Sequence, residues 1–194
     1  MTREDRAITI VELITHAMAA LNDGEQAEQL VCRTLAKASA AETAALISIE
    51  IGRRIQLHAV WPDQRHASVL AEVALRGGRH TVGNLHLAQH PALGEIVAIG
   101  PDLDLHQNQE RGRVLALSRR GGFGPEAHAL FAEAAAPLQL LLPHTADACR
   151  RARQARTAAD AAADLNLTTR EVEVLQLLAE GLLARTIATR LGLS

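Results

Sequence analysis

The last thirty residues of this 194-residue chain contain two short helical patterns separated by a glycine. Thr168 and Glu171 stand three residues apart just ahead of the first pattern, which is the spacing of a capping box at a helix N-terminus. Gly181 follows this pattern, and glycine readily adopts the left-handed conformation that ends a helix. The second pattern runs from Leu183 to Leu191 and stops before a second glycine. The segment therefore predicts two short helices joined by a tight turn, the first half of a helix-turn-helix.

This segment resembles the DNA-binding domain of LuxR-type transcriptional regulators. The family pattern is L-T-x-R-E-x-E-V-L-x-L-L-A-x-G-L, followed by I-A-x-x-L-x-L-S. The positions that match it without gaps are Leu167, Thr168, Arg170, Glu171, Glu173, Val174, Leu175, Leu177, Leu178, Ala179, Gly181, Leu182, Ile187, Ala188, Leu191, Leu193 and Ser194. The alternative is a helical hairpin that is capped by chance, but the whole string is far more specific than a single cap.

The resemblance assigns roles to residues of the segment. It implies DNA contacts from Arg185, Thr186, Arg190 and Ser194. It implies a structural role in capping and packing for Thr168, Arg170, Glu171, Val174, Leu175, Gly181, Ile187, Ala188 and Leu191. The segment departs from the family pattern in two places. Thr169 replaces the usual proline. Leu183 to Thr186 replace a polar stretch that approaches the phosphate backbone in the family, so Arg185 alone keeps that role.

The family places its recognition helix, and a fourth helix that often dimerises, after the position of Ser194. Because the second helix of a helix-turn-helix motif supplies the base contacts, we expect a truncated domain that binds DNA weakly and without specificity. A natural terminus, a frameshift product and a boundary within a longer protein all agree with the sequence.

The net charge of the whole chain is −2 and its isoelectric point is about 6.5, so bulk charge does not indicate a nucleic-acid partner. A DNA role would need a local basic patch. Residues 145–163 are rich in alanine and arginine and predict a linker helix. Its arginines 150, 151, 153 and 156 would either contact DNA phosphates or form the solvated face of a connector, and the pattern alone favours the connector.

The first 145 residues predict a mixture of helices and strands. Thr2 and Asp5 mark the start of a helix with an apolar stripe, and residues 25–40 predict a second helix. Alternation around Ile47–Ile51 and Ile55–Trp61 predicts a β-hairpin that turns at Gly52. The apolar stripe consists of Ile8, Val11, Ile14, Met18 and Leu21. The remaining predicted elements are a helix over 67–75, strands over 82–87, 95–99 and 113–118, and a closing helix from Pro125 that Pro137 should kink or break.

This layout resembles the GAF-like domain often found ahead of a LuxR-type helix-turn-helix. The supporting residues are Leu115 to Glu126, which match a strand, a loop with phenylalanine and a helix start, and Leu142 to His144. The resemblance implies an α+β fold: a GAF-like sensor with a central antiparallel sheet and flanking helices, then a linker helix and a partial all-α helix-turn-helix domain. The expected boundaries are 1–145, 146–164 and 165–194. Residues 76–111 are short for the family, which predicts a reduced or remodelled ligand pocket.

No catalytic or metal-binding pattern is found in the sequence. His80, His86, His90 and His106 lack the spacing of a ligand motif, so we expect no metal. The glycine pairs at 77–78 and 121–122 lack the context of a phosphate-binding loop, and no G-x-S-x-G elbow occurs. Cys32 is expected in the core rather than as a nucleophile. We expect neither an enzyme nor a cofactor.

The remaining features bear on location. The two cysteines, Cys32 and Cys149, suit a reduced cytoplasmic protein, no apolar run is long enough to span a bilayer, and the acidic N-terminus is unlike a secretory signal.

We therefore expect a cytoplasmic LuxR-type transcriptional regulator that a ligand or signal controls through its GAF-like domain and that binds DNA as a dimer. One alternative is an interaction protein that pairs with a full-length regulator without binding DNA. A weaker alternative is a small-molecule sensor that acts without DNA. The ligand, the operator and the sign of regulation are not predicted.

Overall fold

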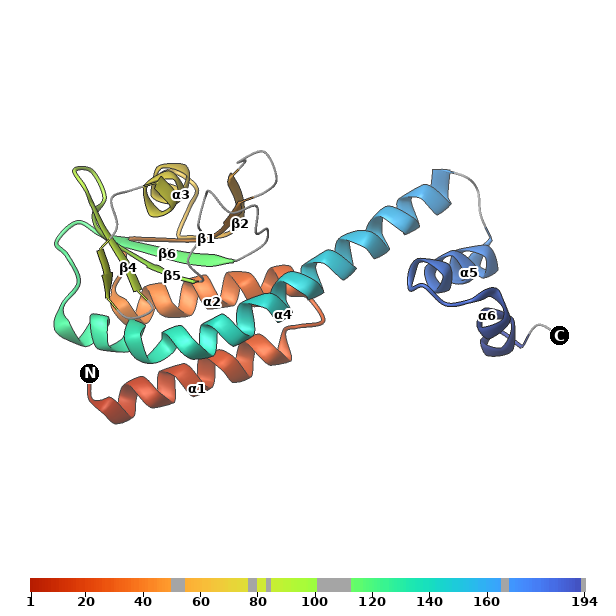
Figure 1. Cartoon of the computed structure of the whole chain (residues 1–194), viewed down its shortest axis with the longest axis horizontal. Helices are drawn as coiled ribbons and strands as arrows, with labels where there is room; N and C mark the ends of the chain where they lie inside the picture. The colour runs from red at the N-terminus through yellow and green to blue at the C-terminus, as the bar shows by residue number, and fades with distance from the viewer. Residues whose placement is uncertain (50–54, 77–79, 83–84, 101–112, 165–167, 193–194) are drawn as a thin grey trace. The chain divides into compact units, whose positions relative to one another are not determined.

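The computed structural model describes residues 1–194 apart from 50–54, 77–79, 83–84, 101–112, 165–167 and 193–194 (Figure 1). The helices are α1 Arg3–Ala19, α2 Gly24–Ser39, α3 Ala67–Arg76, α4 Pro125–Asp164, α5 Thr169–Ala179 and α6 Ala184–Arg190. The strands are β1 Thr43–Ile49, β2 Ile55–Trp61, β3 His80–Val82, β4 Leu85–His90, β5 Gly94–Ile99 and β6 Val114–Arg119. The chain divides into two units, Met1–Ala148 and Cys149–Ser194.

The first unit is built on one antiparallel sheet with the strand order β2-β1-β6-β5-β4-β3. Strands β1, β6 and β5 are central, and their side chains alternate between two buried faces. On β6, Leu115 and Leu117 belong to one core, whereas Val114 and Ala116 belong to the other. The central strands are therefore apolar on both faces, as a sheet covered on both sides requires.

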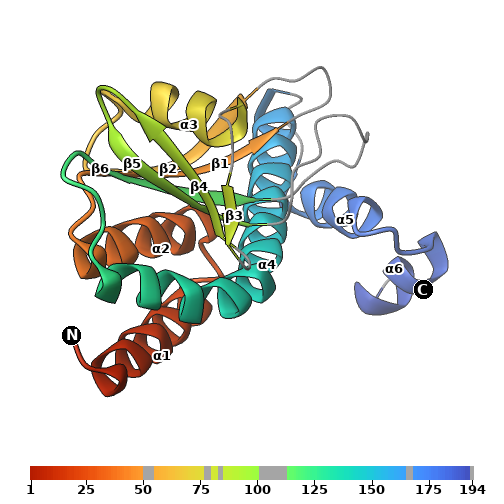
Figure 2. The same ribbon diagram turned by 60° about the vertical axis from the view of Figure 1, so that its left-hand side comes forward.

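Helices cover the two faces unequally, as Figures 1 and 2 show. The larger core joins one face to α1, α2 and the first part of α4, through residues such as Leu13, Leu35 and Phe131. The smaller core joins the other face to α3, through Leu70 and Leu75. This arrangement confirms the predicted α+β class with a central antiparallel sheet and flanking helices.

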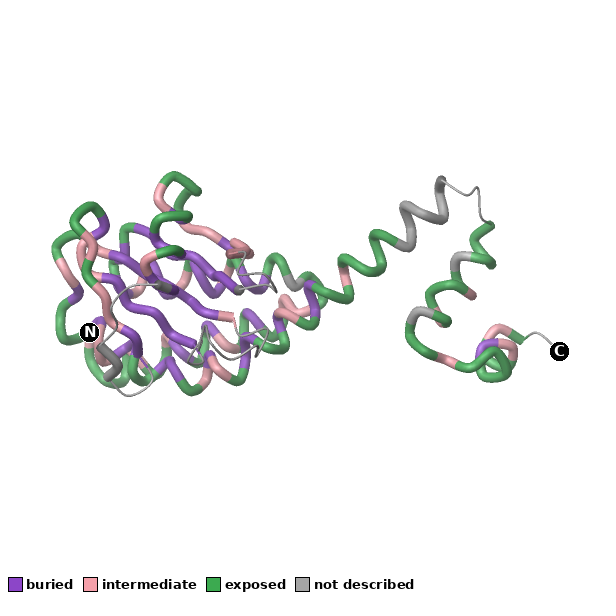
Figure 3. The backbone as a smooth tube through the Cα atoms, turned by 45° about the horizontal axis from the view of Figure 1, so that its top comes forward, coloured by how far each residue is buried: buried purple, intermediate pink, exposed green. Residues whose placement is uncertain are grey.

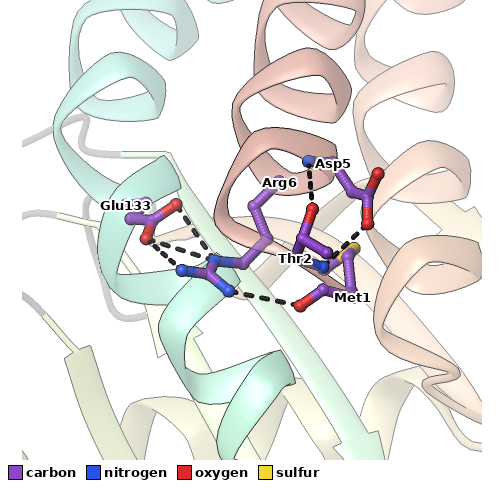
Figure 4. Close-up of polar contacts among 5 residues, drawn as sticks. All are labelled: Met1, Thr2, Asp5, Arg6 and Glu133. Atoms are coloured by element: carbon purple, nitrogen blue, oxygen red, sulfur yellow. Dashed lines mark hydrogen bonds and ion pairs between the residues drawn. The ribbon is translucent and has the colours of Figure 1, made fainter.

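Polar contacts fix the N-terminus of α1 to α4 (Figure 4). Thr2 and Asp5 form the predicted capping box: Thr2 N donates to the Asp5 carboxylate at 2.7 Å, and Asp5 N donates to the Thr2 hydroxyl at 3.1 Å. The Arg6 guanidinium donates to Glu133 through Nη2 at 2.8 Å and through Nε at 3.1 Å. The Met1 ammonium lies 2.5 Å from Glu126. The first turn of α1 is thus stabilised by its capping box and is joined to α4 by two ion pairs.

The buried face of α1 is not the stripe that the sequence suggests. Ile8, Val11 and Met18 are 50%, 62% and 50% exposed, whereas Ile10, Leu13 and Ala17 are buried. The helix itself is predicted correctly. Periodicity cannot choose between two overlapping apolar faces, because it carries no information about which face meets α2.

Two other expectations need correction. The single strand expected over 82–87 is two strands, β3 and β4, which pair with each other antiparallel from His80 opposite Leu87 to Val82 opposite Leu85. Of the kink or break expected at Pro137, a break does not occur, because α4 continues through Pro137 and Pro143 to Asp164. A proline removes one hydrogen bond of the helix, and the buried neighbours Ala134 and Leu138 hold the helix against the sheet on both sides of it.

The other predicted elements match closely, including the helix α3 and the strands β5 and β6. The turn expected at Gly52 and the end of the first predicted hairpin strand at Ile51 lie outside the described residues. So do residues 77–79, 83–84 and 101–111 of the short middle segment 76–111.

Candidate DNA-binding segment

Helix α5 begins with the capping box that the sequence predicts. The Glu171 carboxylate accepts from Thr168 N at 2.8 Å and from the Thr168 hydroxyl at 2.7 Å, and Glu171 N lies 3.4 Å from the same hydroxyl oxygen. These hydrogen bonds favour the ionised carboxylate and lower the pKa of Glu171 below its ordinary value. Leu167, which precedes the cap, lies outside the described residues.

Gly181 ends α5 in a Schellman motif. Gly181 has a φ of +79°, a left-handed conformation that suits glycine. Its N–H donates to the Leu178 carbonyl at 2.9 Å, and the N–H of Leu182 donates to the Leu177 carbonyl at 3.1 Å. These are the two hydrogen bonds of the motif, and they satisfy carbonyl groups that the helix end would otherwise leave open. The geometry sets the direction in which the chain enters α6.

Arg170 connects the start of α5 to the end of α6. Its guanidinium Nη1 donates to Glu173 at 2.7 Å, and Nη2 donates to the main-chain carbonyl of Leu191. Ile187 of α6 is buried. Arg170 therefore closes the two-helix unit, which is the kind of structural role that the resemblance implies for it.

Helix α6 carries the basic side chains for which DNA contacts are expected. Arg185, Thr186 and Arg190 are all exposed. Leu183 takes the N-cap position and makes no side-chain capping bond, in agreement with the departure from the polar family pattern. Ser194 and the side chain of Val172 lie outside the described residues.

Most of the described residues of α5 and α6 are exposed, as the colouring of the backbone in Figure 3 shows. Leu175, Leu178 and Leu183 are 42%, 48% and 77% exposed. Val174, Ala188 and Leu191 are half-buried. Among the described residues of α5 and α6, Ile187 is the one that is buried. The two helices bring the expected residues together, but they share a small core.

Of the four histidines considered as metal ligands, the structure describes the side chains of His86 and His90. His86 and His90 are four residues apart on β4, which places them about 13 Å apart along the strand, too far to share one ion. His90 Nδ1 instead accepts from Ala92 N at 3.2 Å. The His80 side chain and His106 lie outside the described residues, and no group of three or more candidate metal ligands occurs among the residues that are described.

The two cysteines are buried, as expected for Cys32. Burial, with the nearby Glu28 carboxylate adding to it, raises the pKa of the Cys32 thiol far above its ordinary value. Its Sγ lies 3.7 Å from the Ala59 carbonyl oxygen. This environment suits a core residue and disfavours a thiolate nucleophile.

Two polar pairs, Glu28 with Arg113 and Ser48 with His58, were not predicted from the sequence. Arg113, which directly precedes β6, lies 2.9 Å from Glu28 of α2, and their side chains are 9% and 1% exposed. The Ser48 hydroxyl of β1 lies 2.7 Å from Nε2 of His58, on β2. Continuing the β1–β6 register by one residue places Ser48 opposite Arg113. Glu28, Ser48 and His58 come from α2, β1 and β2, and Arg113 directly precedes β6, so no local spacing could have indicated these contacts.

Residues 165–194 match the family described as bacterial regulatory proteins, luxR family. The C-terminal segment is of the LuxR type. We call residues 165–194, which this match covers, the LuxR-type segment. The comparison with curated proteins found no match. Among the described residues, no helix combines the length and the apolar character needed to cross a bilayer.

Solved structures similar to this chain include several GAF domains. A GAF domain from Pseudomonas syringae pv. tomato is 14% identical with a TM-score of 0.48, and the match covers 81% of this chain and 96% of that one. The GAF domain of a phosphoenolpyruvate-protein phosphotransferase from Acinetobacter is 12% identical with a TM-score of 0.47, and the match covers 76% of this chain and 97% of that one. The type II free methionine-R-sulfoxide reductase from Thermoplasma acidophilum is 15% identical with a TM-score of 0.41, over 66% of this chain and 96% of that one.

Proposed function

We propose that this chain is a transcriptional regulator in which the LuxR-type segment contacts DNA under the control of the N-terminal unit. The observation that carries the proposal is the complete local geometry of α5 and α6: the Thr168 capping box, the Schellman turn at Gly181 and the Arg170 contact with Leu191. These features occur in the segment that matches the luxR family.

The proposed organisation has three parts: a GAF-like sensory domain over 1–145, a linker helix over 146–164 and a partial helix-turn-helix domain over 165–194. The antiparallel sheet covered by helices supports the first part, and the continuity of α4 to Asp164 supports the second. A small molecule or another signal at the first part would change the geometry or the pairing of the DNA-binding parts. Such a protein would act in the cytoplasm, and regulation rather than catalysis would be its role.

The proposed DNA contacts are Arg185, Thr186, Arg190 and Ser194. The exposure of Arg185 and Arg190 leaves their guanidinium groups accessible to phosphate. Because phosphate contacts carry no sequence information, binding through these residues should be independent of sequence and should depend on salt.

The test is the salt dependence of binding of the full chain to a fluorescent 20-base-pair duplex. R185Q/R190Q should lower the slope of log K against log salt by about 2, because each phosphate contact contributes about 1. R33Q/R65Q, which removes the same charge at two exposed positions of the first unit, should leave the slope unchanged. An unchanged slope in R185Q/R190Q would contradict the proposed contacts.

A second candidate function is pairing with another copy or with a full-length relative without DNA contact. The specific observation in its favour is the exposed apolar stripe of α1, Ile8, Val11 and Met18. Single exposed apolar residues are common, but three on one helix face suit contact with a partner. This candidate and the regulator share the expectation of a dimer and differ in DNA binding.

A further inference from the structure

Charge is distributed unevenly along this chain. Residues 149–194 contain seven arginines and five acidic residues and carry a net charge of +2, whereas the whole chain carries −2, so residues 1–148 carry −4. Four of the seven arginines lie between residues 150 and 156. A charge asymmetry of this kind, which the bulk value conceals, indicates that the basic part meets a polyanion.

The four arginines lie on the part of α4 that belongs to the second unit. Arg150, Arg151, Arg153 and Arg156 are all exposed. Helical geometry places Arg150, Arg153 and Arg156 within an arc of about 120° and over a length of about 9 Å. We call these three residues the arginine face. Arg151 lies to one side of it.

The residues between the arginines identify the kind of partner. From Arg150 to Thr157 the helix carries no apolar side chain larger than alanine. A helix that lies on a membrane, or in the apolar groove of another protein, needs large apolar side chains opposite its charges. From Arg150 to Thr157 the surface is therefore basic and lacks large apolar side chains, and a partner that presents a row of phosphates complements it.

We propose that the arginine face binds the phosphate backbone of DNA and extends the contact made by the LuxR-type segment. The inference rests on the proposed function. Duplex DNA presents one charge per about 1.7 Å of its axis, so about five phosphates occupy the length of the arginine face. Arginine suits them because its planar guanidinium donates two parallel hydrogen bonds to one phosphate.

The connection to α5 makes joint binding possible. Three residues separate Asp164 from Thr168, so the two Cα atoms lie within about 14 Å of each other even if the chain is fully extended. Contact by one surface therefore holds the other near the same duplex at high effective concentration. Two weak phosphate-binding surfaces joined in this way bind more tightly than either surface alone.

The test compares full-length variants on two unrelated 20-base-pair duplexes by fluorescence anisotropy over a fourfold range of salt. R150Q/R153Q/R156Q should lower the slope of log K against log salt by about 2.7 on both duplexes, so the wild type should lose about 40-fold more affinity than the variant over that range. Glutamine preserves helix propensity, and circular dichroism verifies the fold. R150K/R153K/R156K should retain most of the slope, and R3Q/R33Q/R65Q, three exposed arginines of the first unit, should retain all of it.

The outcomes separate this inference from the proposed function. One outcome is that R150Q/R153Q/R156Q keeps the wild-type slope of log K against log salt, whereas R185Q/R190Q has a lower slope. In that case the arginine face does not contact DNA, and the proposed function as a regulator is retained. If the reverse holds, the arginine face binds DNA and the contacts proposed on α6 are wrong. A wild-type chain that shows no salt-dependent binding overturns both. A parallel measurement compares binding of the wild type and of R150Q/R153Q/R156Q to anionic vesicles. If the variant loses vesicle binding but keeps the wild-type DNA binding, the partner is a membrane and the inference is overturned.

Discussion

The residues that cap α5 lead to a prediction about pH. The hydrogen bonds from Thr168 lower the pKa of the Glu171 carboxyl in the folded chain below the 4.5 of the unfolded chain. A depressed carboxyl pKa stabilises the fold above the unfolded value, and this stabilisation is lost as the pH falls through the folded value. A carboxyl NMR titration should show Glu171 titrating below 4.5. In T168A the pKa should return toward 4.5, and an unchanged value in that variant would show that the cap is not the cause.

The buried pair of Glu28 and Arg113 leads to a second prediction. Removing one partner leaves a buried charge, which costs about 3–5 kcal/mol, whereas replacing both partners with apolar side chains avoids that cost. E28L and R113M should each lower the free energy of unfolding in urea by about this amount. The double variant E28L/R113M should lose clearly less than the sum of the two. Additive losses would show that the two charges do not stabilise each other.

At the scale of elements, sequence reasoning succeeds where the determinants are local. The capping boxes at Thr2 and Thr168 and the alternation along β1 and β2 are properties of a few neighbouring residues, and the structure contains these elements. Their lengths and directions follow from hydrogen bonds within one turn or between adjacent strands. The Schellman turn at Gly181 belongs to the same class.

Expectations from the sequence were wrong or incomplete where contacts between residues far apart in the chain determine the structure. Of the kink or break expected at Pro137, a break is absent, and the residues of α4 on both sides of Pro137 are buried in the core. The exposed stripe of α1 differs from its buried face. The strand order and the contact of Arg113 with Glu28 join positions far apart in the chain. In the DNA-binding segment, spacing predicts the caps, but the contact between Arg170 and the Leu191 carbonyl depends on how α5 and α6 meet.

At the scale of the whole molecule, the two units have different sources of stability. The first unit has two apolar cores on either side of one sheet. In α5 and α6, three leucines are at least 42% exposed and Ile187 is buried. The second unit gains little from its own core, and a bound partner that orders it would therefore contribute a large part of its stability.

Pairing of the whole chain is the last prediction. If the exposed stripe of α1 forms an interface between two copies, the wild type should sediment as a dimer, at twice 20.8 kDa. V11E places a charge in the stripe and should give a monomer with an unchanged circular dichroism spectrum, because Val11 is 62% exposed in the single chain. V69E is the matched control, since Val69 on α3 is 43% exposed and lies outside the stripe. A monomeric wild type, or a V11E variant that remains dimeric, would rule out this interface. A dimer lost in V11E together with the DNA affinity would show that the two LuxR-type segments act as a pair, because joined sites bind with an avidity that separate sites lack.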